Sequence, residues 1–294
     1  MKRIVRVGSR DSKLAVAQTE LVLKEIKKAH PEIEFELITM KTTGDKILDK
    51  NLDSIGGKGL FVKELDLALL ENRIDLAVHS LKDLPMELNE KIPLVALSER
   101  EDPRDVLVVK SGALEKVAEG CIGTSSRRRM VQLQKLYPKA TFQGIRGNVQ
   151  TRLNKLENQD YVATVFAKAG LCRLQMEDLI DRTFSVEEVI PAAGQGILAL
   201  QGRAGEDYEY LSCVHSMESE YAAKAERSFV SYLNGGCSSP IGAYASVAGD
   251  RLTLRGLYYH EPAQDYSVGV REGAVTEAEA IGEELAKELL AQWC

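Results

Sequence analysis

The sequence lacks the features that mark membrane proteins, disulfide-rich proteins and zinc proteins. No apolar run approaches the roughly 20 residues that a membrane-spanning helix needs. The five cysteines are an odd number and form no C-x-x-C pair, which argues against a disulfide framework and a structural zinc site. The four histidines are scattered through the chain, so the sequence predicts no metal.

The bulk composition is that of a globular protein with a real core. The chain has 294 residues, 44% of them hydrophobic and 28% charged, which predicts two or three domains. Residues 1–7 alternate like an opening strand and lack the long apolar stretch of a signal peptide. We therefore expect the protein in the cytoplasm, away from membranes.

Positive charge is concentrated in one segment of an otherwise acidic chain. Residues 124–173 hold ten lysines and arginines but two acidic residues, a net +8, so a total of −6 leaves −14 for the rest. The overall acidity argues against nucleic acid as a partner, while the local excess predicts an anion site. Arg127, Arg128 and Arg129 alone would usually be a solvated helix face. The nearby Arg146 and Arg152, beside small residues, favour convergence on carboxylate or phosphate.

Strands alternate with helices over the first two thirds of the chain, which predicts an α/β fold with mainly parallel sheets. Ser12 is expected to cap a helix through Lys28 whose apolar side includes Leu21 and Ile26. The pattern restarts after residues 101–104, and residues 191–196 mark a second crossover. The predicted strands are 4–7, 35–40, 76–79, 105–109, 122–124, 141–144, 161–167 and 197–201.

The last part of the chain predicts a small α+β domain. A helix over about 219–233 precedes three strand-like runs at 243–248, 252–258 and 265–270. A final helix is expected to start at Thr276, because Thr276 and Glu279 have the spacing of a capping box.

Two residues stand out for chemistry, and each has an ordinary alternative. Cys237 lies in an open Gly-Gly-Cys turn, but no histidine is near in sequence to activate it, and most cysteines are inert. Spacing alone favours a small residue in a turn. Asp83 follows the strand at 76–79, where α/β sheets place ligands, and could be an acid catalyst or equally a helix cap or a surface ion-pair partner of Lys82. The glycine-rich residues 56–59 and 194–196 match neither a P-loop nor a dinucleotide motif.

Taken together and in order, these motifs resemble the porphobilinogen deaminase (hydroxymethylbilane synthase) family along the whole chain. The stretches that carry the resemblance are residues 8–15, 56–64, 78–85, 101–105, 123–126, 146–149, 151–153, 169–171, 194–196 and 235–237. Each motif is modest by itself, but their number and order are highly specific.

The resemblance implies three domains, two of them like type II periplasmic binding proteins. Domain 1 would comprise residues 1–99 and 197–215, domain 2 residues 103–192, and domain 3 residues 218–294. It also implies a transferase of tetrapyrrole biosynthesis, expected as a monomer. A dipyrromethane cofactor would be held by a thioether to Cys237, and four molecules of the substrate porphobilinogen would be joined head to tail with loss of ammonia.

The resemblance also assigns roles to particular residues. Asp83 would be the catalytic acid. The cofactor would contact Cys237, Lys82, Asp83, Thr124, Ser125, Ser126, Arg128, Arg129, Arg146 and Gly147. The substrate would contact Arg10, Ser12, Lys58, Arg146, Arg152, Arg173 and Gln195.

The sequence departs from the family pattern at a few positions. Arg127 stands where an apolar residue is expected, so which two arginines of the triplet face the cleft is left open. Cys172, Ser239 and Gln201 also depart, but none of them is Asp83 or Cys237. The alternative to an enzyme is a non-catalytic two-lobed anion-binding protein, which would explain the arginines but not Asp83 together with Cys237.

Overall fold

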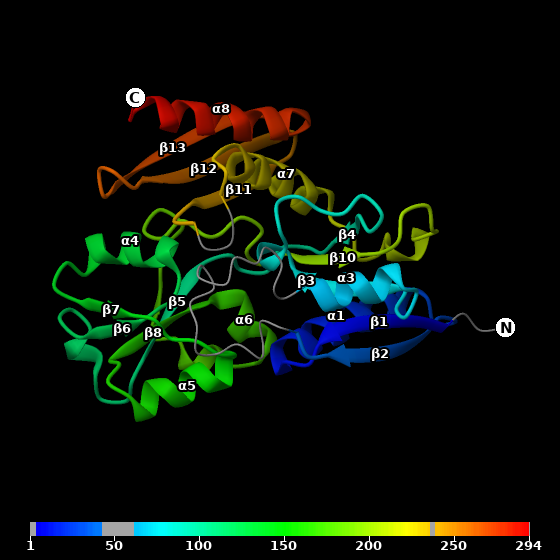
Figure 1. The fold of residues 1–294 in the computed structure, drawn as a ribbon, viewed down its shortest axis with the longest axis horizontal. Helices are drawn as coiled ribbons and strands as arrows, with labels where there is room; N and C mark the ends of the chain where they lie inside the picture. The colour runs from blue at the N-terminus through cyan, green and yellow to red at the C-terminus, as the bar shows by residue number, and fades with distance from the viewer. Residues whose placement is uncertain (1–3, 43–61, 236–238, 294) are drawn as a thin grey trace. The chain divides into compact units, whose positions relative to one another are not determined.

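The computed structural model describes residues 4–42, 62–235 and 239–293 (Figure 1). The chain divides into two compact units, one of Met1–Glu101 with Ile197–Glu220 and one of Asp102–Gly196 with Tyr221–Cys294. The three sequence-based domain boundaries stay a prediction. Within the described ranges, no helix is both long enough and apolar enough to cross a membrane.

The first unit is built on a five-stranded sheet with the order β2-β1-β3-β10-β4 (Figure 1). Its strands are β1 (Ile4–Arg10), β2 (Glu34–Met40), β3 (Leu76–Ser80), β4 (Leu94–Leu97) and β10 (Leu198–Gln201). Strands β2, β1 and β3 are parallel, but β10 runs antiparallel to both of its neighbours. Because β3 and β4 both run against β10, they run in the same direction, so four of the five strands are parallel. The prediction of a mainly parallel sheet is confirmed here, and the exception, β10, comes from the returning chain.

Helices cover both faces of this sheet. On one face, α1 (Lys13–Ala29) buries Val22 and Ile26 against β1 and β3. On the other, α3 (Lys63–Leu70) packs Leu65 and Leu69 in a second cluster. The predicted cap of α1 is confirmed, since the amide of Ala15 donates to Ser12 Oγ at 3.2 Å. The predicted burial of Leu21 is wrong, because its side chain is exposed and Gln18 and Thr19 are buried instead.

The second unit contains a sheet with the order β7-β6-β8-β5-β9. Its strands are β5 (Asp105–Val109), β6 (Cys121–Gly123), β7 (Thr141–Gln143), β8 (Ala163–Ala167) and β9 (Arg182–Thr183). Strands β7, β6 and β8 are parallel, whereas β5 runs antiparallel to β8 and β9. The mainly parallel prediction is confirmed here too, since β7, β6, β8 and β9 run in one direction and β5, the strand that follows the first crossover, runs against them.

Three helices accompany this sheet: α4 (Arg127–Leu136), α5 (Val149–Asn158) and α6 (Lys168–Arg173). Helix α4 packs Leu133 into a core with Ile122, Val165 and Phe184. Ser126 caps α4 and Asn148 caps α5 through their side-chain oxygens. The Ser126 cap starts α4 at the arginine triplet, and the Asn148 cap starts α5 just after the loop that holds Arg146.

The C-terminal part is a three-stranded antiparallel sheet with two helices, as predicted. It comprises α7 (Met217–Tyr232), β11 (Gly242–Ala248), β12 (Arg251–His260), β13 (Asp265–Ala274) and α8 (Ala278–Ala291). The predicted capping box is wrong, since residues 275–277 form a 3₁₀ turn and Glu277 precedes α8 without a side-chain cap. The α/β class, with two sheet-based lobes and a small α+β part, is confirmed.

Gly256 is expected to be intolerant of a side chain, because α7 and α8 both pack closely over it. A Cβ built there would lie 2.5 Å from Phe229 Cζ and 3.1 Å from Leu285 Cδ2. Overpacking should make Gly256→Ala less stable by about 1–3 kcal/mol. Urea unfolding measures this, with Gly144→Ala as the control, where the nearest atom is Ser125 Oγ at 3.4 Å. Equal unfolding midpoints for Gly256→Ala and the wild type would contradict the expectation.

Candidate functional site

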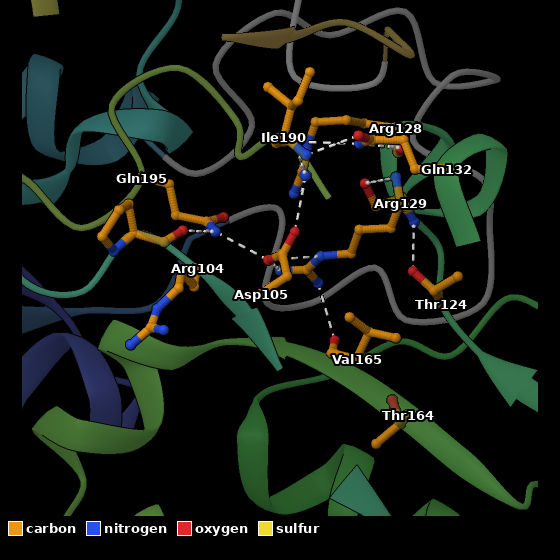
Figure 2. A network of polar contacts seen from close by, with 12 residues as sticks. Arg104, Asp105, Thr124, Arg128, Arg129, Gln132, Thr164, Val165, Ile190 and Gln195 are labelled. Carbon is orange, nitrogen blue, oxygen red and sulfur yellow. Dashed lines mark hydrogen bonds and ion pairs between the residues drawn. The ribbon is translucent and has the colours of Figure 1, made fainter. Parts of the chain in front are cut away.

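A fully buried carboxylate, Asp105 at the start of β5, organises the arginine-rich part of the second unit (Figure 2). Arg128 Nη1 donates to one of its oxygens at 2.8 Å. Arg129 donates to the other oxygen from Nε at 3.1 Å and from Nη2 at 2.7 Å. Gln195 Nε2 donates to that same oxygen at 2.9 Å. Three side chains thus satisfy one buried charge.

The same arginines also bind backbone carbonyls of neighbouring segments. Arg128 Nη1 donates to the carbonyl of Ile190 at 2.6 Å, and Arg129 Nη1 donates to that of Val165 at 2.9 Å. Gln132 holds Ile190 from both sides, donating to its carbonyl and accepting from its amide. Because these bonds connect α4 both to β8 and to the segment at Ile190, the first turn of α4 is fixed in place.

The start of α4 determines which arginines point inward. The amide of Arg129 donates to Ser126 Oγ, and from this start Arg128 and Arg129 turn toward the sheet, where their exposed fractions are 4% and 8%. Arg127 points away and pairs with Glu261 at 2.5 Å. The structure thus separates the triplet into two buried members and one outward member.

Arg152, on α5, extends the buried positive charge. Its Nη2 donates to Thr164 Oγ1 at 3.1 Å and to the carbonyl of Val165 at 2.6 Å, and its guanidinium lies 4.1 Å from the centroid of the Phe166 ring. Its Nε is buried and has no partner among the described residues. Within the described ranges, three buried guanidiniums therefore accompany one carboxylate, which leaves an excess of two positive charges there.

The pKa values follow from this arrangement. Burial acts to raise the pKa of Asp105, but the charges of Arg128 and Arg129 outweigh it and hold that pKa well below its usual range. Burial, followed by the charge of Arg129, lowers the pKa of Arg152 to about 9. Both groups are still ionised at neutral pH, so the excess of positive charge persists there.

The other predicted site residues of this unit lie in the loops before its helices. Thr124 Oγ1 accepts from the amide of Ser126, and Ser125 Oγ donates to the carbonyl of Ile145. Arg146 is half-buried. Gly147 has φ +117°, and a Cβ there would lie 2.5 Å from Thr151 Cγ2, so this turn requires glycine.

Arg173 and Gln195 fix the segment that leaves the unit. Arg173 Nη2 donates to the carbonyl of Gly196 at 2.5 Å. Gln195 is 1% exposed, and besides Asp105 its Nε2 binds the carbonyl of Pro103 at 2.6 Å. Gln195 therefore connects both crossover segments to the buried carboxylate.

The predicted residues of the first unit gather at one edge of its sheet. Arg10 ends β1, and Lys82 and Asp83, both half-buried, follow β3 in a 3₁₀ turn. Because β1 and β3 are parallel and pair through Val7 with Leu76, their carboxyl ends meet at the same edge. Ser12 serves as the cap of α1.

Some functional candidates were missed or cannot be placed. Asp105 and Gln132 were not singled out, although an acidic residue directly after a crossover could have drawn attention to Asp105. His79 was also missed; burial, then the charge of Arg10, lowers its pKa to about 4, so its imidazole is neutral at neutral pH. Cys237 and Lys58 lie outside the described residues.

Comparison with known proteins identifies the family. The model "Porphobilinogen deaminase, dipyromethane cofactor binding domain" matches residues 5–210, and "Porphobilinogen deaminase, C-terminal domain" matches residues 221–291. The chain belongs to the porphobilinogen deaminase family.

Curated members of the porphobilinogen deaminase family match nearly the full length. The porphobilinogen deaminase of Ruminiclostridium cellulolyticum is 53% identical over 98% of this chain and 98% of its own. That of Acetivibrio thermocellus is 52% identical over 97% of this chain and 98% of its own. A solved structure, the methionine binding protein MetQ, has a TM-score of 0.44 and 12% identity over 75% of this chain and 94% of its own.

Asp105→Asn is expected to destabilise the protein strongly. Removing one partner of a buried ion pair costs about 3–5 kcal/mol, and here two guanidiniums lose their counter-charge. Because the folded pKa of Asp105 is depressed, its contribution is complete above its unfolded pKa of about 3.9 and is lost as the pH falls. Urea unfolding should show a difference from wild type that is constant between about pH 5 and 7 and shrinks below about pH 4.

The exposed Asp250 supplies the control, since Asp250→Asn should leave the unfolding free energy within about 0.5 kcal/mol of the wild type. A wild-type-like unfolding free energy for Asp105→Asn at neutral pH would mean that the buried pair does not stabilise the fold.

Proposed function

We propose that this chain is a porphobilinogen deaminase, a transferase that joins four porphobilinogen molecules head to tail into hydroxymethylbilane and releases ammonia. The observation that carries the proposal is the buried network of Arg128, Arg129 and Arg152, which holds three positive charges against the one carboxylate of Asp105. Membership of the porphobilinogen deaminase family supports it. The alternative, a non-catalytic anion-binding protein, is not favoured by that membership.

The described residues fit the dipyrromethane that the family uses. This group is built from two substrate units, each with an acetate and a propionate, so it brings carboxylates to the excess positive charge. A guanidinium has five N–H donors. Among the described residues, Arg128 uses two of these donors and Arg129 uses three, so both keep donors for a ligand carboxylate. Arg152 adds a further donor, its Nε, which has no partner in the described part of the chain.

We assign the basic and polar residues to binding. The dipyrromethane would be held by Arg128, Arg129, Arg146, Thr124, Ser125, Ser126, Gly147 and Lys82. When bound by a thioether to Cys237, this group supplies the nucleophilic pyrrole carbon for chain growth. The incoming substrate would be bound by Arg10, Ser12, Lys58, Arg146, Arg152, Arg173 and Gln195. The planar guanidinium fork suits carboxylates better than an ammonium does, which supports arginine at these positions.

Asp83 is assigned the acid–base role. As a carboxylic acid it would protonate the leaving amine of porphobilinogen. As a carboxylate it would then stabilise the cationic azafulvene left from the substrate and collect the proton displaced from the pyrrole carbon. One carboxyl group serves all three steps because its proton returns in every cycle. The position of Asp83 at the carboxyl end of β3 supports this role.

Cys237 is expected to be the only covalent attachment site. The intact mass of the purified protein should exceed that of the bare chain by two pyrrole units, and peptide mapping should place them on Cys237. Cys237→Ser should lack the increment. Cys213→Ser is the matched control, because Cys213 is an exposed free thiol and its loss should leave the increment in place. An adduct on any other cysteine would overturn the assignment.

Asp83→Asn tests the catalytic assignment separately from binding. Asparagine keeps the shape of the side chain but loses both the proton and the charge. Acid–base assistance supplies roughly 10²–10⁴-fold in rate, so turnover should fall by at least that factor. The protein should still fold and carry the dipyrromethane, while Asp83→Glu should give intermediate turnover. Turnover is to be measured in folded, cofactor-loaded protein. Activity of Asp83→Asn within a few-fold of wild type would move the role to another residue.

The compartment and the oligomeric state stay predictions. We expect a monomer in the cytoplasm, and neither nucleic acid nor membrane as a partner.

A further inference from the structure

The hairpin formed by β12 and β13 extends beyond the third strand of its sheet. Strand β11 pairs with β12 only as far as Gly242 opposite Leu257. Strands β12 and β13 stay paired out to His260 opposite Asp265. Residues 258–267, here called the hairpin tip, are therefore a two-stranded ribbon, which is marginally stable by itself. Contacts on its two faces must hold it.

One face of the hairpin tip is held by the end of the chain. The His260 ring stacks on Trp293, with centroids 4.8 Å apart and an angle of 11° between the planes. Trp293 Nε1 donates to Ser267 Oγ at 3.1 Å. These two contacts of Trp293 hold the face of the hairpin tip that is continuous with the face packed against α8.

The opposite face of the hairpin tip carries two tyrosines, and each meets a cation of α4. Tyr259 and Tyr266 are cross-strand partners, and alternation along the strand places them on the face away from His260. Lys135 Nζ lies 3.8 Å from the centroid of the Tyr266 ring, and the Arg127 guanidinium 5.9 Å from that of Tyr259.

Each of these cations also has a carboxylate partner at the turn end of the hairpin, Glu261 in the turn and Asp265 at the start of β13. Arg127 Nη2 lies 2.5 Å from Glu261 Oε1, and Lys135 Nζ lies 2.7 Å from Asp265 Oδ1. The hydrogen bond from Lys135 lowers the pKa of Asp265. Arg127 and Lys135 are eight residues apart in α4, so the two points of contact are separated by about 12 Å along the helix.

The inner side of the same helix bears Arg128 and Arg129. We propose that the hairpin tip is a docking surface for α4, and that Arg127, Lys135, Glu261 and Asp265 are positioning residues. Their contacts fix the position of the C-terminal part of the chain relative to α4, and therefore relative to the buried guanidiniums of Arg128 and Arg129. The consequence for cofactor loading rests on the function proposed above, whereas the docking itself does not. The proposal also explains why an arginine stands at position 127.

Backbone hydrogen exchange of the full-length protein tests the docking. Exposed ion pairs and cation–π contacts are individually weak. The two ion pairs and two cation–π contacts together should shift the equilibrium between the docked and the undocked hairpin tip by about 10- to 30-fold. The double variant Arg127→Glu, Lys135→Glu should speed exchange of the amides of residues 258–267 by roughly that factor. Adding Glu261→Arg and Asp265→Lys exchanges the charges and should restore most of the protection.

Two further chains keep this test decisive. The milder Arg127→Gln, Lys135→Gln variant should show the same direction of change with less disturbance of α4. Arg251→Gln is the matched control, because Arg251 pairs with Glu272 at the far end of the same hairpin, at 3.5 Å, and should leave the tip unchanged. Unaltered tip exchange in both α4 variants, or no recovery in the charge-exchanged chain, overturns the docking surface.

Cofactor loading tests the positioning role. Apo-protein is mixed with porphobilinogen, and the fraction carrying the two-pyrrole increment is followed by intact mass. Loading should slow several-fold in the Arg127→Glu, Lys135→Glu chain and recover on charge exchange. A faster-exchanging tip with unchanged loading overturns the positioning role. Absence of any increment in the wild type would instead overturn the proposed function, and the exchange measurement would still decide the docking surface.

Discussion

The arrangement of the second unit depends on the ion pairing of Asp105 with Arg128 and Arg129. A buried carboxylate is tolerated only when its oxygens are fully hydrogen-bonded and its charge is compensated. Asp105 meets both conditions with two guanidiniums and the amide of Gln195. These bonds join the start of β5 to the first turn of α4 and to the segment that leaves the unit after Gln195. The fold and the candidate site are thus stabilised by the same contacts.

That pairing also supports the proposed binding role of the buried arginines. Arg128 and Arg129 are oriented by bonds within the protein, yet neither uses all of its donors. With Arg152 they leave an excess of positive charge that no carboxylate among the described residues neutralises. A site of low dielectric with fixed donors binds an anion without having to reorganise. Rigid orientation of guanidiniums is what a growing chain of carboxylate-bearing pyrroles requires.

Local patterns in the sequence predicted the helix starts only in part. Ser12 was proposed as a cap from its residue type and place, and Thr276 from capping-box spacing, but only Ser12 acts as one, because the turn at 275–277 shifts the start of α8. Leu21 was expected to be buried and is exposed, since the width of the covered face of α1 depends on its packing partners. The mainly parallel sheets were predicted correctly, since four strands of each five-stranded sheet run in one direction. The sequence did not show that β10 and β5 run against them, because that depends on where the chain enters each sheet, which no local pattern records.

The sequence alone determined the family, through ordered motifs, and the concentration of positive charge between Thr124 and Arg173, because both are properties of residue order and composition. It also placed Asp83 after a buried strand. Only the tertiary structure decided which arginines of the triplet point inward. That choice depends on Asp105, which is 23 residues from Arg128 in sequence and becomes its partner only when β5 lies beside α4. Charge compensation in a buried site is a property of three-dimensional proximity, so the sequence alone leaves it undetermined.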